Sequence, residues 1–264
     1  MIDVQNLKDH RNIPLQKVGV KNLRYPVTVL DRDHRTQQTV ATVELYANLP
    51  HHYKGTHMSR FLEVFNTHAS DIRMRHFLQM LEEVRQKLDA QRAFGTLRFP
   101  YFVEKSAPVS GQTSMMDYEC SFSGTVSEDH REFFVSIRVP VTTLCPCSKE
   151  ISDRGAHNQR SFCTVTIKVE EFFWMEDIIG LVESAASCDL HSLLKREDEK
   201  YVTERAYDNP VFVEDLVRNV CVLLEDTYDF PWFSVEATNM ESIHNHDAYA
   251  YVERGENPQE RPCI

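Results

Sequence analysis

The order of hydrophobic and polar residues in the first half predicts strands on either side of two helices. In the segments 23–29 and 43–49 every second residue is apolar, which is typical of strands with one buried face. In 58–65 and about 70–91 the apolar residues recur at every third and fourth position, which predicts helices. Alternating segments follow at 97–106 and 113–126. The first half therefore has the predicted order β-β-α-α-β-β.

The second half predicts a similar order, interrupted by two polar insertions. Its strands are predicted at 133–141, 163–169, 233–239 and 248–252, and its helices at 175–186 and 213–224. The insertions, 142–161 and 195–208, are predicted to be loops. After the second insertion, Asn209-Pro210 predicts an N-cap and first turn for the helix that follows.

These patterns predict an α+β protein of two modules, residues 1–127 and 128–264. Each module would have an antiparallel sheet with two helices on one face. Because such sheets have open edges, we expect copies of the chain to assemble through them. The polar ends, 1 to about 20 and 255–264, are expected to be loosely held.

The insertion 142–161 carries side chains that bind metals. Cys145 and His157 offer a thiolate and an imidazole, which are preferred ligands of zinc and similar ions. Because Pro146 separates Cys145 from Cys147, we expect one cysteine to bind and the other to support it. The spacing alone leaves a metal ligand and a reactive or merely packed thiol as open alternatives.

Four more polar residues of the second half are candidates for a site. Glu199 lies in a charged run and is either a solvated surface residue or a third ligand. Glu214 lies in the first turn of a predicted helix. Its carboxylate is either stabilised there by the helix dipole or accepts hydrogen bonds from a ligand. His244 and His246 are either surface residues or proton shuttles.

Composition narrows the class of protein. The 264 residues carry a net charge of −11, which disfavours non-specific binding of nucleic acid. No apolar run reaches the roughly 20 residues of a membrane span. The N-terminus has no signal-peptide pattern, and the cysteines number seven. Reduced thiols and a cytoplasmic location are therefore expected.

Long motifs of this chain resemble a known family. Residues 139–161 read V-P-V-T-T-L-C-P-C-S-K-E-I-S-D-R-G-A-H-N-Q-R-S, and 198–215 read D-E-K-Y-V-T-E-R-A-Y-D-N-P-V-F-V-E-D. With S-I-H-N-H-D-A-Y-A at 242–250 and Y-K-G-T-H-M-S-R-F at 53–61, they resemble GTP cyclohydrolase type IB. The resemblance implies tandem tunnelling-fold (T-fold) modules in a homotetramer, with sites at subunit interfaces. It also implies conversion of GTP and water to 7,8-dihydroneopterin triphosphate and formate, at the entry to folate biosynthesis.

The resemblance also implies roles for individual residues. Cys145, His157 and Glu199 would hold a divalent ion, either zinc, manganese or iron, and Glu214 would anchor the purine. The implied histidines beside the reacting carbon are His244 and His246. Binding of the triphosphate is assigned to cations of the 142–161 loop, namely Lys149, Arg154 and Arg160.

Two other functions are compatible with the same residues. A nitrile reductase of the same fold acts on a deazaguanine with NADPH through a lone cysteine and without a metal. A non-catalytic purine-binding assembly protein would use zinc as a closed four-ligand staple. Oxidation of NADPH would reveal the nitrile reductase, and turnover of GTP would exclude the non-catalytic binding protein.

Overall fold

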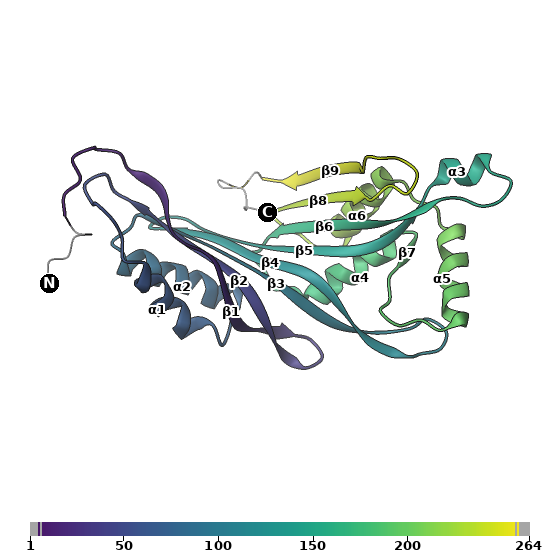
Figure 1. Ribbon diagram of the computed structural model, residues 1–264, viewed down its shortest axis with the longest axis horizontal. Helices are drawn as coiled ribbons and strands as arrows, with labels where there is room; N and C mark the ends of the chain where they lie inside the picture. Colours follow the sequence, from purple (N-terminus) through teal and green to yellow (C-terminus); the bar gives the residue numbers. More distant parts are fainter. Residues whose placement is uncertain (1–4, 6, 257, 259–264) are drawn as a thin grey trace. The chain divides into compact units, whose positions relative to one another are not determined.

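The computed structural model describes residues 5, 7–256 and 258, and shows a mixed α+β protein (Figure 1). Its strands are β1 (Leu15–Asp31), β2 (Arg35–Leu49), β3 (Arg92–Ser106), β4 (Thr113–Ser127), β5 (Arg131–Leu144), β6 (Asn158–Lys168), β7 (Cys188–Asp189), β8 (Trp232–Asn239) and β9 (Ala248–Gly255). Its helices are α1 (Met58–His68), α2 (Met74–Lys87), α3 (Pro146–Ile151), α4 (Met175–Ala185), α5 (Arg196–Asp208) and α6 (Val213–Thr227). Hydrogen bonds link the strands in the order β1-β2-β3-β4-β5-β6-β8-β9, with β7 paired to β5. Of the ends predicted to be loosely held, residues 1–4, 6, 257 and 259–264 lie outside the described residues.

Contacts divide the chain into two compact units. Of the described residues, the first unit contains those up to Pro100, Ser121–Val135 and Pro258, and the second contains Tyr101–Cys120 and residues 136–256. Each of the strands β3, β4 and β5 thus contributes residues to both units. The module boundary at residue 127 stays a prediction.

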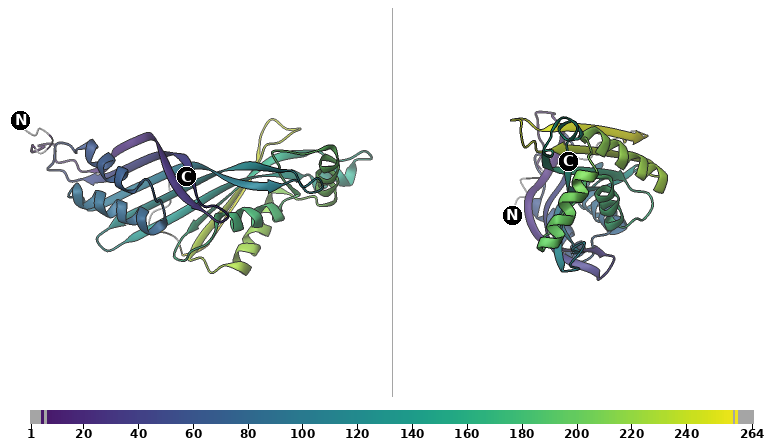
Figure 2. Two further views of the ribbon diagram at one scale, coloured as in Figure 1. Left: turned by 90° about the horizontal axis from the view of Figure 1, so that it is seen from below. Right: turned by 90° about the vertical axis from the view of Figure 1, so that its right-hand side faces the viewer.

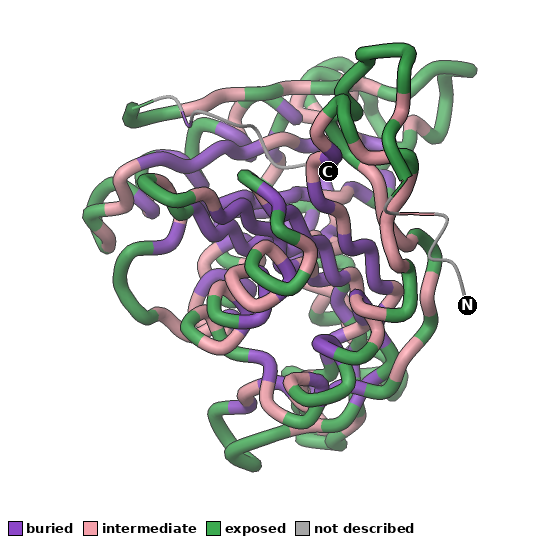
Figure 3. The backbone as a smooth tube through the Cα atoms, turned by 90° about the vertical axis from the view of Figure 1, so that its left-hand side faces the viewer, coloured by how far each residue is buried: buried purple, intermediate pink, exposed green. Residues whose placement is uncertain are grey.

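In the first unit, α1 and α2 pack on one face of the sheet (Figure 2). A Cβ at Gly95 would lie 2.8 Å from Leu81 Cδ2 and 3.1 Å from Phe77 Cζ, so α2 sits directly against β3. Buried segments concentrate in the strands, while the turns between them are exposed (Figure 3). Strand β1 begins at Leu15, so the expectation of a loose arm to about residue 20 was wrong from Leu15 onward. Pairing of this end with β2 orders it.

In the second unit, α4 and α6 bury apolar faces that the sequence pattern predicted. Ile178, Val182, Leu216 and Val220 are each fully buried. Their helical spacing reflects this single apolar face. It explains why the bounds predicted from sequence for both helices lie close to the observed ones.

The prediction of a loop at 195–208 was wrong, because this segment forms α5. The helix buries Ala206 and Asp198 and few apolar groups, so it lacks the periodicity that identifies a helix. The buried Asp198 carboxylate stabilises its start by accepting from Lys195 N at 2.8 Å. Asn209 is consequently the C-cap of α5, and the N-cap of α6 is Phe212, so the predicted cap at Asn209-Pro210 was also wrong.

Candidate functional site

Cys145 lies where β5 ends and α3 begins. It is the N-cap of α3, with Pro146 at the first helical position, and its Sγ accepts a hydrogen bond from Ser148 N at 3.4 Å. The predicted loop 142–161 therefore contains a short helix, which turns the chain back on itself. As a result Cys145 N donates to the carbonyl oxygen of His157 at 3.1 Å. The structure brings these two candidate ligands together.

Hydrogen bonds orient the His157 ring. Its Nδ1 lies 3.1 Å from Gln159 Oε1 and 3.4 Å from Ser242 Oγ. Gln159 directs its amide nitrogen to Thr143 Oγ1 at 2.7 Å, so its oxygen is left to accept from His157. This network favours a proton on Nδ1, which leaves the Nε2 lone pair for a metal. Gln159 and Thr143 were not identified from sequence, although the H-N-Q-R motif contains one of them.

Glu199 lies in the first turn of α5 and is exposed. Among the described residues no group of three His, Cys, Asp or Glu side chains is placed to hold a metal ion. A single chain thus brings Cys145 and His157 together, and does not bring Glu199 to them. The soft sulfur and the free imidazole nitrogen suit a zinc-like ion, which needs a further ligand.

Glu214 is exposed in the first turn of α6. Val211, just before this helix, donates its N–H to the carbonyl oxygen of Leu144 at 3.1 Å. Because Leu144 precedes Cys145, the start of α6 is tied to the chain beside the candidate ligand.

His244 and His246 lie in the segment 240–247 between β8 and β9. Their rings are stacked, with centroids 5.1 Å apart, and both side chains are exposed. This segment is attached beside His157 through Ser242, and Met240 N donates to the carbonyl oxygen of Arg160 at 3.0 Å. The two histidines therefore belong to a segment that contacts the Cys145–His157 pair.

The candidate triphosphate residues have different surroundings. Lys149 donates to the carbonyl oxygen of Tyr207 and lies 4.4 Å from the centre of its ring. Arg160 and Arg138 both line a cavity of about 340 Å³. The Arg138 guanidinium lies 3.6 Å from the centre of the Phe162 ring. Arg154 is exposed. Their assignment to the triphosphate stays a prediction.

Two buried polar groups were not found from sequence. The Asp198 carboxylate accepts from Val109 N, Ser110 N and Ser110 Oγ at 2.6–2.9 Å and so fixes α5 to the turn between β3 and β4. Burial raises the pKa of Asp198, but its hydrogen bonds from Ser110, Lys195 and Val109 outweigh burial and hold the pKa below its usual range.

The second group surrounds Lys105 of β3. Its ammonium lies 2.8 Å from Glu183 Oε1, 2.9 Å from Asp189 Oδ2 and 2.8 Å from the carbonyl oxygen of Leu190. Tyr118 also donates to Glu183, at 2.8 Å. The partners are 78 or more residues from Lys105 in sequence, so no local motif marks them.

Comparison with known proteins identifies the family. The sequence matches the family model for type I GTP cyclohydrolase folE2 over residues 1–250. The chain belongs to the FolE2 family. A FolE2 GTP cyclohydrolase of Syntrophus aciditrophicus (strain SB) is 59% identical over 96% of this chain and 100% of the relative. One from Geotalea uraniireducens (strain Rf4) is 51% identical over 99% of this chain and 98% of the relative. The resemblance inferred from the motifs is confirmed.

Solved structures of urate oxidases share the fold of this FolE2 family member. Uricase from Arthrobacter globiformis has a TM-score of 0.52 at 8% identity, over 94% of this chain and 96% of that chain. Urate oxidase from Bacillus subtilis 168 has a TM-score of 0.53 at 8% identity, over 91% and 98%. At this identity the similarity shows the fold alone. The α+β class with a large antiparallel sheet is confirmed, and the division into tandem β-β-α-α-β-β modules stays a prediction. None of the helices that the structure describes is long and apolar enough to cross a membrane.

Proposed function

We propose that the chain hydrolyses GTP to 7,8-dihydroneopterin triphosphate and formate, the first step of folate biosynthesis. Membership of the FolE2 family supports the reaction. The observation that carries the proposal is the pairing of Cys145 with His157, whose ring is oriented by Gln159.

Cys145 and His157 fit two positions of a divalent metal site, and we assign the third ligand to Glu199. The ion would be zinc, manganese or iron, because a set of one sulfur, one nitrogen and one oxygen selects weakly among them. When bound, such an ion lowers the pKa of a coordinated water from 15.7 to about 7. In the proposed homotetramer, with sites at subunit interfaces, the exposed Glu199 of a neighbouring copy is available to complete the set.

Glu214 is the proposed anchor of the guanine ring. Its carboxylate would accept hydrogen bonds from N1–H and from the exocyclic amine of guanine. Adenine presents an acceptor in place of N1–H and leaves the carboxylate unpaired, at a cost of about 1–3 kcal/mol. The exposed position of Glu214 in the first turn of α6 supports this role, because a ligand can reach it.

His244 and His246 are the proposed proton carriers. Imidazoles exchange protons near neutral pH, and opening of the five-membered ring of guanine requires a proton on the leaving nitrogen. The hydrogen bond between His157 and Ser242 supports their placement, because it attaches their segment to the candidate ligands.

The proposed quaternary arrangement is a homotetramer of chains with tandem T-fold modules. The first half supports it with the order β1-β2-α1-α2-β3-β4. The second half adds α3, β7 and α5 to that order. The exposed sheet edges at β1 and β9 are available for pairing between copies.

The experiment that tests the function begins with protein stripped of metal. Manganese or zinc is restored, GTP is added, and pterin fluorescence after oxidation is measured together with formate. Metal-dependent formation of both products is the expected result. Intact GTP in the presence of either ion would refute the proposal, and oxidation of NADPH with a deazaguanine nitrile would then identify the reductase.

A further inference from the structure

Polar side chains replace the apolar core at one end of three neighbouring strands, β5, β6 and β8. Up to this end the alternate core positions are apolar, namely Ile137, Val139 and Val141 in β5, Cys163, Val165 and Ile167 in β6, and Phe233, Val235 and Ala237 in β8. The next positions on the same face are Thr143, Ser161 and Asn239, which are 0%, 0% and 3% exposed. Buried polar groups need hydrogen bonds to offset their loss of water, so these side chains depend on partners at this end.

A chain of hydrogen bonds runs from His157 into this polar end. Its first two links, from His157 to Gln159 and from Gln159 to Thr143, orient the ring of His157. The third link joins Thr143 Oγ1 and Ser161 Oγ at 2.8 Å, and either hydroxyl can be its donor. Asn239 lies directly opposite Ser161 in the pairing of β6 with β8. Side chains at directly opposed positions of an antiparallel pair are within reach of each other.

The hydrogens of this chain can point in two opposite directions. In the first direction Gln159 donates to Thr143, Thr143 donates to Ser161, and Gln159 Oε1 accepts from His157 Nδ1. In the second direction both hydroxyls donate toward His157, the amide of Gln159 is turned over, and its N–H donates to Nδ1. The ring hydrogen of His157 then lies on Nε2, where it blocks a metal. The first direction ends in a Ser161 hydroxyl that needs an acceptor.

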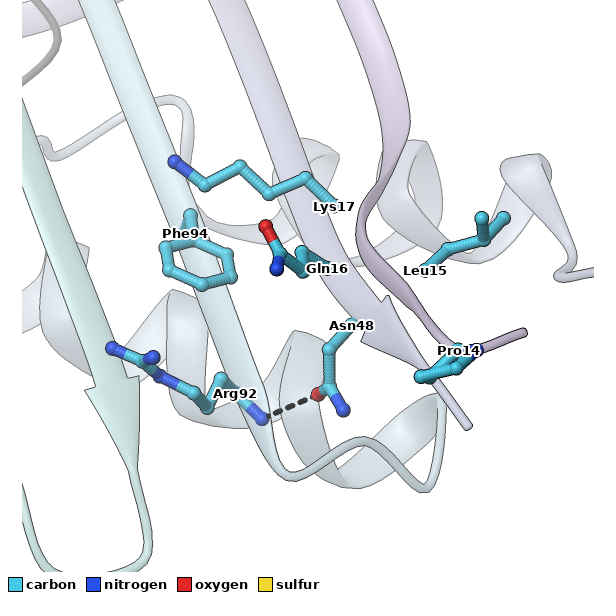
Figure 4. Close-up of a pocket in the computed structure, with 7 residues that line it drawn as sticks. All are labelled: Pro14, Leu15, Gln16, Lys17, Asn48, Arg92 and Phe94. Carbon is cyan, nitrogen blue, oxygen red and sulfur yellow. Dashed lines mark hydrogen bonds between the residues drawn. The ribbon is translucent and has the colours of Figure 1, made fainter. Parts of the chain in front are cut away.

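Asn239 provides this acceptor. Its Oδ1 is buried and makes no hydrogen bond with the residues that the structure describes. Asn48, at a cavity of the first unit, shows the usual arrangement, because its Oδ1 accepts from Arg92 N at 2.7 Å (Figure 4). An unpaired buried acceptor is costly, and the hydrogen of a hydroxyl turns to suit its neighbours. A rotation of the Asn239 or Ser161 side chain therefore favours donation from Ser161 to Asn239 Oδ1.

We propose that Thr143, Ser161 and Asn239 are positioning residues that set the direction of this chain and so present His157 Nε2 to the ion. The first direction pairs both hydroxyl hydrogens and Asn239 Oδ1, whereas the second leaves Asn239 Oδ1 unpaired. The three residues act through Gln159, because they are buried beneath it. The inference rests on the ligand role that the proposed function gives to His157.

The test measures the zinc affinity of the metal-free full chain by competition with a chelator, without GTP. Thr143→Val keeps the shape of the side chain and removes its hydroxyl, so it should weaken zinc binding at least about tenfold. Thr143→Ser keeps a hydroxyl and should retain most of the affinity. The matched control is Thr166→Val, which removes a buried hydroxyl that lies 2.7 Å from Ser136 Oγ, farther along the same two strands.

Thr166→Val should leave the zinc affinity unchanged even where it lowers the stability of the chain. The proposal is overturned by equal affinities of Thr143→Val and the unaltered protein, or by equal losses in Thr143→Val and Thr166→Val. Equal losses in Thr143→Val and Thr143→Ser would also overturn it, because the hydroxyl would then not be the cause.

A further variant, Asn239→Leu, tests the far end of the chain. Leucine has a similar size and no acceptor, so the Ser161 hydroxyl would lose its partner and zinc binding should weaken, as in Thr143→Val. An unchanged zinc affinity in a folded Asn239→Leu protein would refute the role of Asn239.

These measurements separate a failure of the inference from a failure of the proposed function. Equal zinc binding by all variants would leave the metal site in place and remove Thr143, Ser161 and Asn239 from its control. Absence of zinc binding by the unaltered protein would remove the ligand role of His157, and the inference with it. A lack of GTP turnover changes neither result, because zinc affinity is measured without GTP.

Discussion

Replacing Lys105 with Met would test how far the second unit depends on its buried charges. The Lys105, Glu183 and Asp189 side chains are 12%, 13% and 16% exposed, and the ammonium contacts both carboxylates within 3 Å. Methionine has a similar length and no charge, so Glu183 and Asp189 would both lose the ammonium that they share, and Asp189 would keep His191 at 3.1 Å and Arg205 at 3.5 Å. Removing one partner of a buried ion pair costs about 3–5 kcal/mol.

This cost is a large part of the total stability of a typical domain, which is about 5–15 kcal/mol. At about 2–4 °C for each kcal/mol, Lys105→Met should lower Tm by roughly 6–20 °C. Urea unfolding followed by circular dichroism gives the free energy of unfolding directly. The matched control is Lys87→Met, whose ammonium contacts Glu63 at 2.8 Å with both side chains about half exposed, and whose loss should cost about 0–1 kcal/mol. Equal losses in the two variants would refute the reasoning.

The same pair of proteins gives a pH test. Burial raises the pKa of Asp189, but the hydrogen bond and charge of Lys105 outweigh it and hold the pKa below 3.8. A lowered folded-state pKa adds stability that is present above the unfolded value and is lost as the pH falls through the folded value. Lys105 provides the largest contributions that lower the Asp189 pKa, so in the variant this pKa should rise, and the difference in unfolding free energy between the two proteins should narrow from pH 7 to pH 4.5. A difference independent of pH would contradict an electrostatic origin.

Three predictions concern the candidate site. Cys145→Ala should lose bound metal and turnover, whereas Cys147→Ala should keep both; metal analysis and rates check this, and retention of both by Cys145→Ala would remove it from the ligand set. Glu214→Gln should raise KM for GTP or abolish binding while the metal content stays normal, and an unchanged GTP affinity would exclude the anchor role. Gln159→Ala should weaken metal binding about 10–100-fold by freeing the His157 ring, as competition with a chelator would measure, and unaltered affinity would show that the hydrogen bond does not orient the ligand.

The sequence predicted elements wherever one face of the element is buried. Alternation identified the strands other than the two-residue β7. Three-to-four spacing identified α1, α2, α4 and α6, because each of these helices packs one apolar face on the sheet. The helix α5 was missed, since it is fixed by a buried carboxylate and has no apolar stripe. The start of β1 was missed because its residues are exposed and carry no alternation of burial.

For the candidate site, the sequence predicted the contacts between residues that are close in the chain and missed the contacts between residues that are distant in the chain. Cys145 and His157 meet within one loop, so a motif was enough to pair them. Asp198 and Lys105 bind partners more than 70 residues away, and only the folded chain brings these together. The position of Glu199 relative to the other candidate ligands depends on α5, which the sequence pattern did not reveal.

The way in which α5 is attached has a thermodynamic consequence. A helix held by a buried carboxylate and few apolar contacts opens locally at a smaller free energy than one with an apolar face on the core. Its amide hydrogens should therefore exchange earlier than those of α6. Under the proposed ligand set, an ion that binds Glu199 recognises α5 only when the helix is formed, so binding must protect these amides. Ion affinity and the local folding of α5 are then linked, and changes that loosen α5 weaken ion binding without touching a ligand.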